Sequence, residues 1–382
     1  MRFLGIGEYC DLGAMYFRMA QVGHEVRVFV ENPDYHDVYE GMLNFTKNWK
    51  EELNWVREAG GDGIIIFESA TKGNLQDKLR LEGFQVIGGS AFGDQLEADR
   101  SFGQEMMLEM GMCVAKTIAF TSYANAIDFL KKSQKRYVYK SNGADSLRTR
   151  NYVGQLTDSS DLVVLLELYS QQSSTVEIKK SPDFVLMEYI EGVEIGVGAY
   201  FNGENFLHPA CLDWEHKRFF NGNLGELTGE MGTIVTFRDT EKIFNLTLAH
   251  IENRLKESAY CGYINLNMIA NSEGLWPLEF TSRFGYPGYS ICAALQQESW
   301  ESIFKKMLTK SSLNIVTADG FAAGIVLNVP PFPYSYGYAE LSKGTPILFE
   351  PSITREEMNH LDLAEVEKHH GVRFFQLWLV SF

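Results

Sequence analysis

Along the first ninety residues, the pattern of hydrophobic and polar positions switches repeatedly between the period of a strand and the period of a helix. Strands are predicted at RFLGIG (2–7), HEVRVFV (24–30), DGIIIF (62–67) and FQVIGG (84–89). Helices are predicted at LGAMYFRMAQVG (12–23), NWKEELNWVREAG (48–60) and KLRLEG (78–83). This alternation predicts an α/β domain in which a parallel sheet carries helices on its faces. Only G-x-G follows the first strand, without the third glycine of a dinucleotide-binding motif, which argues against such a site.

The middle of the chain carries longer elements separated by two loops. The pattern predicts one helix from Leu96 to Gly111, and a strand around YVYK (137–140) that leads into the loop SNGADSLRTR (141–150). A helix around DLVVLLELYSQQ (161–172) and a strand–turn–strand hairpin at FVLMEYIEGVEIGVGAYF (184–201) follow. The stretch NGNLGELTGEMGT (221–233) predicts a glycine-dense loop.

The last third of the chain is predicted to be a mixture of helix and strand. After Asp239, one helical stripe is hydrophobic and therefore faces a core; it comprises Phe244, Leu248, Ile251 and Leu255. The C-terminal segment predicts strands, beginning with GFAAGIVLNV (320–329), and one late helix. Thr354 and Glu357 have the spacing of a capping box at the start of that helix.

Composition narrows the class of protein. The 382 residues, 45% hydrophobic and 22% charged, indicate a globular protein of two or three domains, and no apolar run is long enough for a membrane helix. The start MRFLGIGEYC reads as a buried strand rather than a signal peptide. The net charge of −16 argues against nucleic acid and anionic membranes as partners. Five scattered cysteines without C-x-x-C argue against a disulfide framework or zinc site and favour a reducing cytoplasm.

The stretch WPLEFTSRFGYPG (276–288) is the first candidate for chemistry. It forms the second strand of a predicted pair with GYINLNMI (262–269), and its alternation would put Glu279, Thr281 and Arg283 on one face. Such a face indicates either an ordinary surface ion pair or a site in which a carboxylate holds Mg²⁺ and an arginine holds a phosphoryl group. Asn267 on the partner strand could add an amide oxygen, or be an ordinary edge residue.

Two further stretches are typical of nucleotide binding, although each also has an ordinary explanation. Lys140 and Arg148 flank a loop of small residues, which suits phosphate contact or is a solvated basic loop. In MEYIEGVE, the backbone of Glu188 and Ile190 could contact a base and Glu194 a sugar hydroxyl; alternatively this is a charged hairpin.

A fourth stretch, EHKRFFNGNLGELTGEMG (215–232), combines basic residues with glycines. His216, Lys217 and Arg218 precede a segment in which Gly229 and Gly232 would permit close backbone approach to a ligand. This favours a substrate-binding role, while His216 alone is more often a structural histidine.

Taken in order, these motifs resemble those of the ATP-grasp ligases, and within them the glycinamide ribonucleotide synthetases (phosphoribosylamine–glycine ligases). The resemblance runs from about Glu97 to Gly288 and is fainter in the N-terminal domain and at 320–334. The matching motifs are EADRSFGQEMMLEMGMCVA, YVYKSNG, LMEYIEGVE, EHKRFFNGNLGELTGEMG and LEFTSRFGYPG.

The resemblance implies a fold and a division into domains. It implies an N-terminal parallel-sheet domain (1–95), a two-lobed α+β ATP-grasp domain (96–312) with a lid lobe at about 114–188, and a small β-rich C-terminal domain (313–382). It also implies a reaction: ATP converts a carboxylate to an acyl phosphate, and a small-molecule amine displaces phosphate to give an amide. Both a monomer and a homodimer remain open.

The resemblance further implies roles for individual residues. ATP would be bound by Arg100, Lys140, Arg148, Glu188, Ile190 and Glu194. Mg²⁺ or Mn²⁺ would be held by Glu279, Thr281 and Asn267. Arg283, Lys217 and Arg218 would act in catalysis, and His216, Gly229 and Gly232 would contact substrates.

Several residues depart from the family pattern. Thr281 stands where the family has Asn, and the loop after Lys140 is not glycine-rich. GEYCDLGAMY (7–16) replaces the glycine-rich motif that binds the ribose phosphate, and FESATKGN (67–74) lacks the family's substrate residues. Three hypotheses follow: a ligase that uses an amine other than phosphoribosylamine, a true phosphoribosylamine–glycine ligase, and an ATP-binding protein without catalysis.

Overall fold

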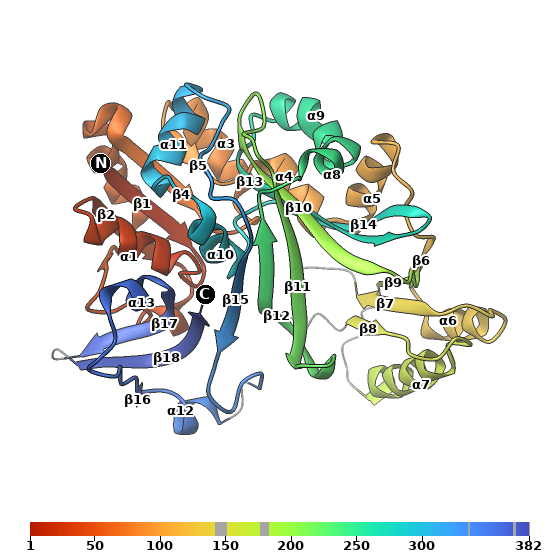
Figure 1. The fold of residues 1–382 in the computed structure, drawn as a ribbon. Helices are drawn as coiled ribbons and strands as arrows, with labels where there is room; N and C mark the ends of the chain where they lie inside the picture. Colours follow the sequence, from red (N-terminus) through yellow and green to blue (C-terminus); the bar gives the residue numbers. More distant parts are fainter. Residues whose placement is uncertain (142–150, 176–182, 335–336, 370–371, 382) are drawn as a thin grey trace. The chain divides into compact units, whose positions relative to one another are not determined.

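The computed structural model describes residues 1–141, 151–175, 183–334, 337–369 and 372–381. The chain divides into two compact units (Figure 1). The first comprises Met1–Asp94, Ile195–Leu266 and Phe280–Phe382, and the second comprises Gln95–Glu194 and Asn267–Glu279. The described residues include no helix that is both long and hydrophobic enough to cross a membrane.

The first unit begins with the predicted parallel sheet, whose strand order is β3-β2-β1-β4-β5. Its strands are β1 (Arg2–Gly7), β2 (Glu25–Val30), β3 (Asn44–Phe45), β4 (Gly63–Phe67) and β5 (Gln85–Ile87). Its helices are α1 (Gly13–Gln21), α2 (Leu53–Glu58) and α3 (Gly73–Leu81). The α/β alternation predicted for this region is therefore confirmed.

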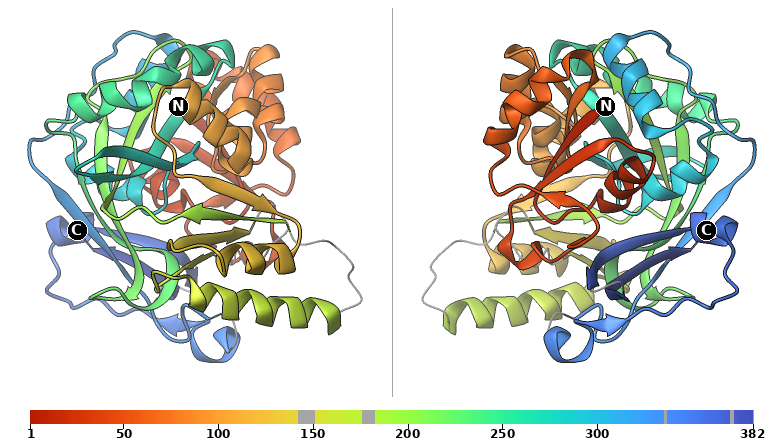
Figure 2. Two further views of the ribbon diagram at one scale, coloured as in Figure 1. Left: turned by 90° about the vertical axis from the view of Figure 1, so that its right-hand side faces the viewer. Right: turned by 90° about the vertical axis from the view of Figure 1, so that its left-hand side faces the viewer.

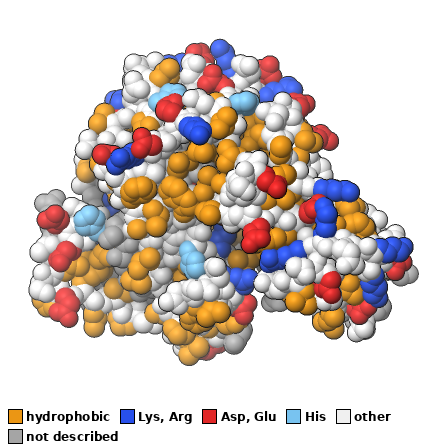
Figure 3. All heavy atoms as spheres, turned by 45° about the vertical axis from the view of Figure 1, so that its right-hand side comes forward, with side chains coloured by type: hydrophobic (Ala, Val, Ile, Leu, Met, Phe, Trp, Pro, Cys, Tyr) orange, Lys and Arg blue, Asp and Glu red, His pale blue; other side chains and the backbone are white. Residues whose placement is uncertain are grey.

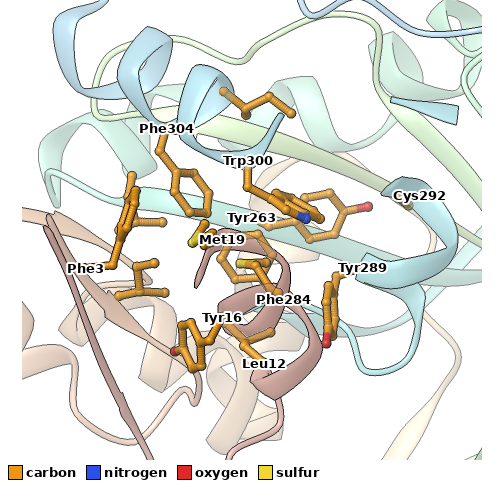
Figure 4. Packing of buried hydrophobic residues seen from close by; sticks show 14 of the residues in the cluster. Phe3, Leu12, Tyr16, Met19, Tyr263, Phe284, Tyr289, Cys292, Trp300 and Phe304 are labelled. Carbon is orange, nitrogen blue, oxygen red and sulfur yellow. The ribbon is translucent and has the colours of Figure 1, made fainter. Parts of the chain in front are cut away.

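Alternate residues of this sheet are buried on opposite faces. On one face, Leu4, Ile65 and Phe67 pack with Val56 of α2 and Leu79 of α3. On the other face, a larger core includes Phe3, Ile64 and Ile66 together with residues of α1 and of the C-terminal third (Figure 4). The members labelled in Figure 4 are Phe3, Leu12, Tyr16, Met19, Tyr263, Phe284, Tyr289, Cys292, Trp300 and Phe304. This core ties segments far apart in the sequence into one unit.

A nine-stranded sheet has the order β14-β13-β10-β11-β12-β15-β18-β16, with β17 paired to β18. The strands are β10 (Val193–Asn202), β11 (Cys211–Phe220), β12 (Leu224–Thr236), β13 (Cys261–Asn271), β14 (Gly274–Thr281), β15 (Ala322–Leu327), β16 (Thr345–Pro346), β17 (Leu361–His369) and β18 (Val372–Ser381). The predicted pair β13–β14 and the C-terminal strands are confirmed. The loop predicted at 221–233 is wrong for most of its length, because residues 224–233 belong to β12, which pairs with β11 and β15.

The remaining helices of the first unit are α8 (Glu241–Leu246), α9 (Glu252–Glu257), α10 (Gly288–Leu295), α11 (Trp300–Thr309), α12 (Tyr338–Leu341) and α13 (Arg355–Asn359). The stripe of Phe244, Leu248, Ile251 and Leu255 is buried as predicted. The single helix predicted there is wrong, because Thr247 leaves helical geometry and a 3-10 turn, η4 (Leu248–Ile251), follows. The capping box of Thr354 and Glu357 is confirmed at the start of α13.

The second unit contains a four-stranded antiparallel sheet of order β6-β9-β7-β8. The strands are β6 (Thr117–Phe120), β7 (Tyr137–Ser141), β8 (Asn151–Val153) and β9 (Phe184–Glu188), and the helices are α5 (Arg100–Glu109), α6 (Tyr123–Leu130) and α7 (Ser160–Thr175). Hydrophobic residues of α6 and α7 pack on Tyr139 and Phe184, so both helices cover one face of this sheet (Figure 2).

Two predictions for the second unit are corrected. The helix predicted from Leu96 to Gly111 is two helices, because Asp99 adopts an extended conformation after α4 (Ala91–Ala98) and caps α5 with hydrogen bonds from Ser101 N and Phe102 N. The hairpin predicted at 184–201 is also wrong. Its strands, β9 and β10, do not pair with each other but belong to different sheets.

Candidate functional site

Lys140 lies on β7, an inner strand of the four-stranded sheet in the second unit. It pairs with Val185 of β9 and Asn151 of β8, and its side chain is half-buried. Pairing on both sides fixes the backbone from which the lysine projects, as a site that positions phosphate requires. Arg148, predicted to bind the same phosphates, lies outside the described residues.

Glu188 is the last residue of β9, beside β7. Its carboxylate accepts a hydrogen bond from Lys135 Nζ, which raises the pKa of that lysine, and its backbone N–H donates to the Lys116 carbonyl at 2.8 Å. Ile190 lies in the connection that follows, and Glu194 is the second residue of β10. The carboxylate and the backbone N–H of Glu188 therefore both have partners within the unit.

The second unit also contains two of the predicted metal ligands. Asn267 on β13 and Glu279 on β14 lie on neighbouring strands. Asn267 is buried, and Glu279 is exposed. Arg100 belongs to the same unit, as the first residue of α5. This unit therefore contains a lysine, an arginine, a carboxylate and an amide of the predicted nucleotide and metal sites.

Thr281 and Arg283 belong to the first unit, and only Thr281 lies on the strand. β14 ends at Thr281, so the expectation that Arg283 continues the alternation is wrong. Arg283 donates to the carbonyl of Phe284 at 3.2 Å. Burial raises the pKa of Asp11, while the guanidinium of Arg283 works in the opposite direction. The arginine is therefore electrostatically coupled to the loop after β1.

The predicted substrate loop is a β-hairpin, β11–β12, and its basic residues have partners within it. His216 Nε2 lies 3.1 Å from the carbonyl of Phe220, Lys217 pairs with Glu215 at 3.1 Å, and Arg218 donates to the carbonyl of Gly225 at 3.0 Å. These main-chain contacts of His216 and Arg218 stabilise the end of the hairpin.

The two predicted glycines of this hairpin differ in their surroundings. A Cβ on Gly232 would lie 2.9 Å from the carbonyl oxygen of Gly324 on β15, so close strand packing accounts for that glycine. A Cβ on Gly229 would meet nothing within 4 Å. Space therefore restricts the residue at 232 but not at 229.

A pocket in the first unit brings together acidic residues that the sequence patterns did not single out. Asp213 and Glu215 of β11, Glu230 of β12, Asn265 of β13 and the predicted metal ligand Thr281 line it. A signal was present in the sequence: Asp213 and Glu215 are two apart on one strand and so share a face. The third carboxylate comes from a different strand, which spacing alone does not reveal.

The carboxyl groups of this pocket influence one another. The Asn265 amide donates to Asp213 Oδ2 at 2.6 Å, and Thr233 Oγ1 donates to Glu230. Burial, and the charge of Glu215 next, raise the pKa of Glu230 to about 8. A carboxyl with such a pKa can accept and release a proton near neutral pH.

Acidic residues also occupy the carboxyl edge of the parallel sheet, where ligands of open α/β sheets bind. Glu8 follows β1 directly, Glu68 follows β4 directly, and Asp11 lies in the loop after β1. Burial raises the pKa of Glu68 to about 8, and the charge of Asp11 adds to this shift. A hydrogen bond to Glu8 raises the pKa of Tyr9 to about 12. This edge is therefore lined by carboxyl groups.

A parallel-sheet domain, an antiparallel sheet with a central lysine, and a strand pair with a carboxylate and an amide define an ATP-grasp ligase. Residues 98–289 match the sequence family described as phosphoribosylglycinamide synthetase, ATP-grasp (A) domain. This chain belongs to that family, and it is an enzyme.

Relatives and solved structures agree with this assignment. The chain is 24% identical over 363 residues to phosphoribosylamine–glycine ligase of Clostridium acetobutylicum, covering 88% of this chain and 83% of that protein. The same enzyme from Halalkalibacterium halodurans is 24% identical over 297 residues, covering 74% of this chain and 68% of the relative. In fold, the chain is similar to phosphoribosylamine–glycine ligase from Thermotoga maritima, with a TM-score of 0.72 and 19% identity. The match covers 100% of this chain and 91% of that structure. It is also similar to N5-carboxyaminoimidazole synthetase from Staphylococcus aureus complexed with ADP, with a TM-score of 0.58 and 15% identity. That match covers 99% of this chain and 92% of that structure.

Proposed function

We propose that this protein uses ATP to join a carboxylate, an amino acid such as glycine, to an amine other than phosphoribosylamine. The observation that carries the proposal is that three residues of the second unit lie within the family match: Lys140 on an inner strand of the four-stranded sheet, and Asn267 and Glu279 on the neighbouring strands β13 and β14. These positions supply a cation for phosphates and oxygen ligands for a divalent cation. The five cysteines are free thiols, which supports the cytoplasm as the place of action.

The chain's residues divide the reaction between them. Lys140 and Arg100 would hold the ATP phosphates, while the main chain of Glu188 and Ile190 would hold adenine and Glu194 the ribose. Carboxylate, hydroxyl and amide oxygens are ligands that Mg²⁺ and Mn²⁺ accept, so Glu279, Thr281 and Asn267 fit such an ion, which would neutralise phosphate charge.

Basic residues of the first unit would act on the acyl phosphate. The substrate carboxylate oxygen attacks the γ-phosphorus, ADP leaves, and the amine nitrogen then displaces phosphate from the carbonyl carbon. Arg283 would stabilise the charge that develops on the phosphoryl oxygens. Lys217 and Arg218 would attract the anionic substrate, with His216, Gly229 and Gly232 beside it.

The acidic sheet edge supports an amine without a phosphate. Glu8, Asp11 and Glu68 lie in the segments that replace the family's substrate motifs. Carboxyl groups supply no positive charge to a phosphate dianion, and no arginine or lysine occurs between Gly7 and Tyr16 to bind it. A true phosphoribosylamine–glycine ligase is the second candidate, supported by the 24% identity over 88% of the chain. A catalytically inactive ATP-binding protein is the third, supported by Thr281 in place of the family's Asn.

The test is a screen for ADP release with amino acids crossed with amines, including glycine with phosphoribosylamine. Under the proposal, some pair without phosphoribosylamine releases ADP, and Lys140→Ala and Glu279→Ala abolish that release. Glu273→Ala, an exposed glutamate in the turn between β13 and β14, is the matched control and leaves it intact. Activity with phosphoribosylamine alone would establish the second candidate. ATP binding without ADP release for any pair would establish the third.

A further inference from the structure

The acidic pocket of the first unit has no role in the reaction proposed above. Three carboxyl groups line it, from Asp213, Glu215 and Glu230. The charge of Glu215 is offset by its ion pair with Lys217, at 3.1 Å. Lys217 also acts on Glu230, whose pKa it lowers against the larger effect of burial. A cation that enters the pocket would face the carboxyl groups of Asp213 and Glu230.

Asn265 supplies an independent sign of a ligand. The residue is 8% exposed and lines the pocket. Because its amide nitrogen faces Asp213, its oxygen points elsewhere, and among the described residues no donor reaches that oxygen. A buried carbonyl oxygen is normally hydrogen-bonded, so its place in the pocket calls for a donor from a ligand.

The space around these groups is prepared by a glycine and is limited in size. Gly196 on β10 pairs with Asp213, and a Cβ there would lie 2.2 Å from Asp213 Oδ1, so glycine makes room for the carboxylate. The volume open to the centres of water molecules is about 40 Å³, which holds about three water-sized groups.

The walls of the pocket are aromatic, formed by Tyr200, Tyr263, Phe284 and Tyr289. Figure 4 shows Tyr263, Phe284 and Tyr289 in the same cluster, with Cys292, which also lines the pocket, at its right-hand edge. Aromatic faces attract a cation and cover the carbon atoms next to it. An ammonium group with one or two methylene carbons has the size and polarity of this space.

We propose that this pocket binds the primary ammonium group of the amine substrate. The three N–H groups of the ammonium would donate hydrogen bonds to Asp213, Glu230 and the amide oxygen of Asn265. That the bound ammonium belongs to the amine substrate rests on the proposed ligase function. A divalent metal is the other cation to consider. Binding of Mg²⁺ that depends on Asp213 and Glu230 would assign the pocket to a metal instead.

This placement also provides the proton acceptor that amide formation needs. An ammonium ion cannot attack a carbonyl, so one N–H proton must first pass to a carboxylate, for which Glu230 is placed. The neutral nitrogen then forms the C–N bond and the carbonyl C–O bond to phosphate breaks. The second proton of the nitrogen passes to the departing phosphate, which leaves with the electron pair as hydrogen phosphate. Thr281, proposed to hold the metal of the acyl phosphate, lines the same pocket.

The direct test is calorimetric titration of the full chain with ethylammonium chloride, without ATP. Ethylammonium is expected to bind, and Asp213→Asn and Glu230→Gln to weaken binding at least tenfold, whereas tetramethylammonium, which has no N–H, does not bind. Glu226→Gln removes an exposed charge from the same strand as Glu230 and leaves binding unchanged. Ethylammonium that fails to bind, or binds equally to all variants, overturns the proposal, as does Mg²⁺ binding that depends on Asp213 and Glu230.

The pH dependence of ethylammonium binding tests the same assignment in the unaltered protein. Asp213, Glu215 and Lys217 are the charged groups around Glu230, and burial raises the pKa of Tyr200, Tyr263 and Tyr289, which keeps them neutral. Because Glu230 must lose its proton to bind a cation, affinity should rise up to tenfold per pH unit toward pH 8, while alkylamines keep their proton below about pH 10. Affinity independent of pH between 6 and 8 contradicts the role of Glu230.

The two proposals can fail separately. If a carboxylate and an amine cause ADP release but the protein does not bind ethylammonium, the ligase proposal stands and the ammonium-site proposal is rejected. Ethylammonium binding that depends on Asp213, in a protein for which no pair releases ADP, retains the pocket as an ammonium site and removes the ligase.

Discussion

The carboxylate of Glu68 accepts a hydrogen bond from the backbone N–H of Asp11 at 2.9 Å, which ties the end of β4 to the loop after β1. A Cβ on Gly7 would lie 1.9 Å from this carboxylate, so glycine makes room for it on the neighbouring strand. The Glu68 carboxyl is buried, and its pKa is raised to about 8. The folded protein therefore holds a proton here that the unfolded chain releases at lower pH.

This proton makes stability depend on pH in a definite direction. Between the ordinary pKa of 4.5 and about 8, the folded state binds more protons than the unfolded state, so stability falls as pH rises through this window. Glu68→Gln removes this titrating group. Between pH 5 and pH 9, the free energy of unfolding of the wild type should fall by about 2–4 kcal/mol more than that of the variant. Urea unfolding at the two pH values measures the difference. Glu82→Gln, an exposed glutamate, should behave as wild type, and an equal loss in all three proteins contradicts the assignment.

A close backbone contact predicts that Gly262 of the first unit cannot be replaced without loss of stability. A Cβ on Gly262 of β13 would lie 1.5 Å from the carbonyl oxygen of Gly88, whose N–H donates to Cys261 O at 2.7 Å. Gly262→Ala must move one of the two backbones and should lower the free energy of unfolding by more than about 2 kcal/mol. Gly61→Ala is the control, because its Cβ would meet only the Gln85 side chain, at 3.9 Å. Denaturant unfolding that gives the same midpoint for both variants would exclude a tight contact at Gly262.

The sequence was sufficient for features set by local pattern and insufficient for those set by pairing between distant strands. The alternation of the first ninety residues and the stripe from Phe244 to Leu255 follow from periodicity, which burial then satisfies. The glycines of β12 indicated a loop because local residue spacing does not reveal that this segment pairs with β11 and β15. Asp213, Glu230 and Asn265 come together for the same reason, since each lies on a different strand.

Lys140 is expected to contribute to nucleotide affinity rather than to folding. It lies half-buried on β7, and the proposal puts its charge on the ATP phosphates. Lys140→Ala should weaken ATP binding at least tenfold, because a charge-assisted contact to phosphate is worth about 1.5–3 kcal/mol. The dissociation constant can be measured by calorimetry with a non-hydrolysable ATP analogue. Lys132→Ala, which removes an exposed lysine of the same unit, should bind as wild type. Equal affinity in both variants would remove Lys140 from the nucleotide site.

Under the proposed function, Thr281 is a metal ligand and affects how tightly Mg²⁺ binds. The resemblance to the family puts Asn at this position, and an amide oxygen is a better ligand for Mg²⁺ than a neutral hydroxyl. Thr281→Asn should therefore lower the Mg²⁺ concentration needed for half-maximal ADP release, by about two- to tenfold, which corresponds to roughly 0.4–1.4 kcal/mol of binding free energy. Thr281→Val keeps the shape but removes the oxygen, and should raise that concentration. The two variants differ little in side-chain size, so opposite shifts separate ligation from packing. If both variants shift the Mg²⁺ requirement in the same direction, Thr281 lies near the metal site without contributing a ligand.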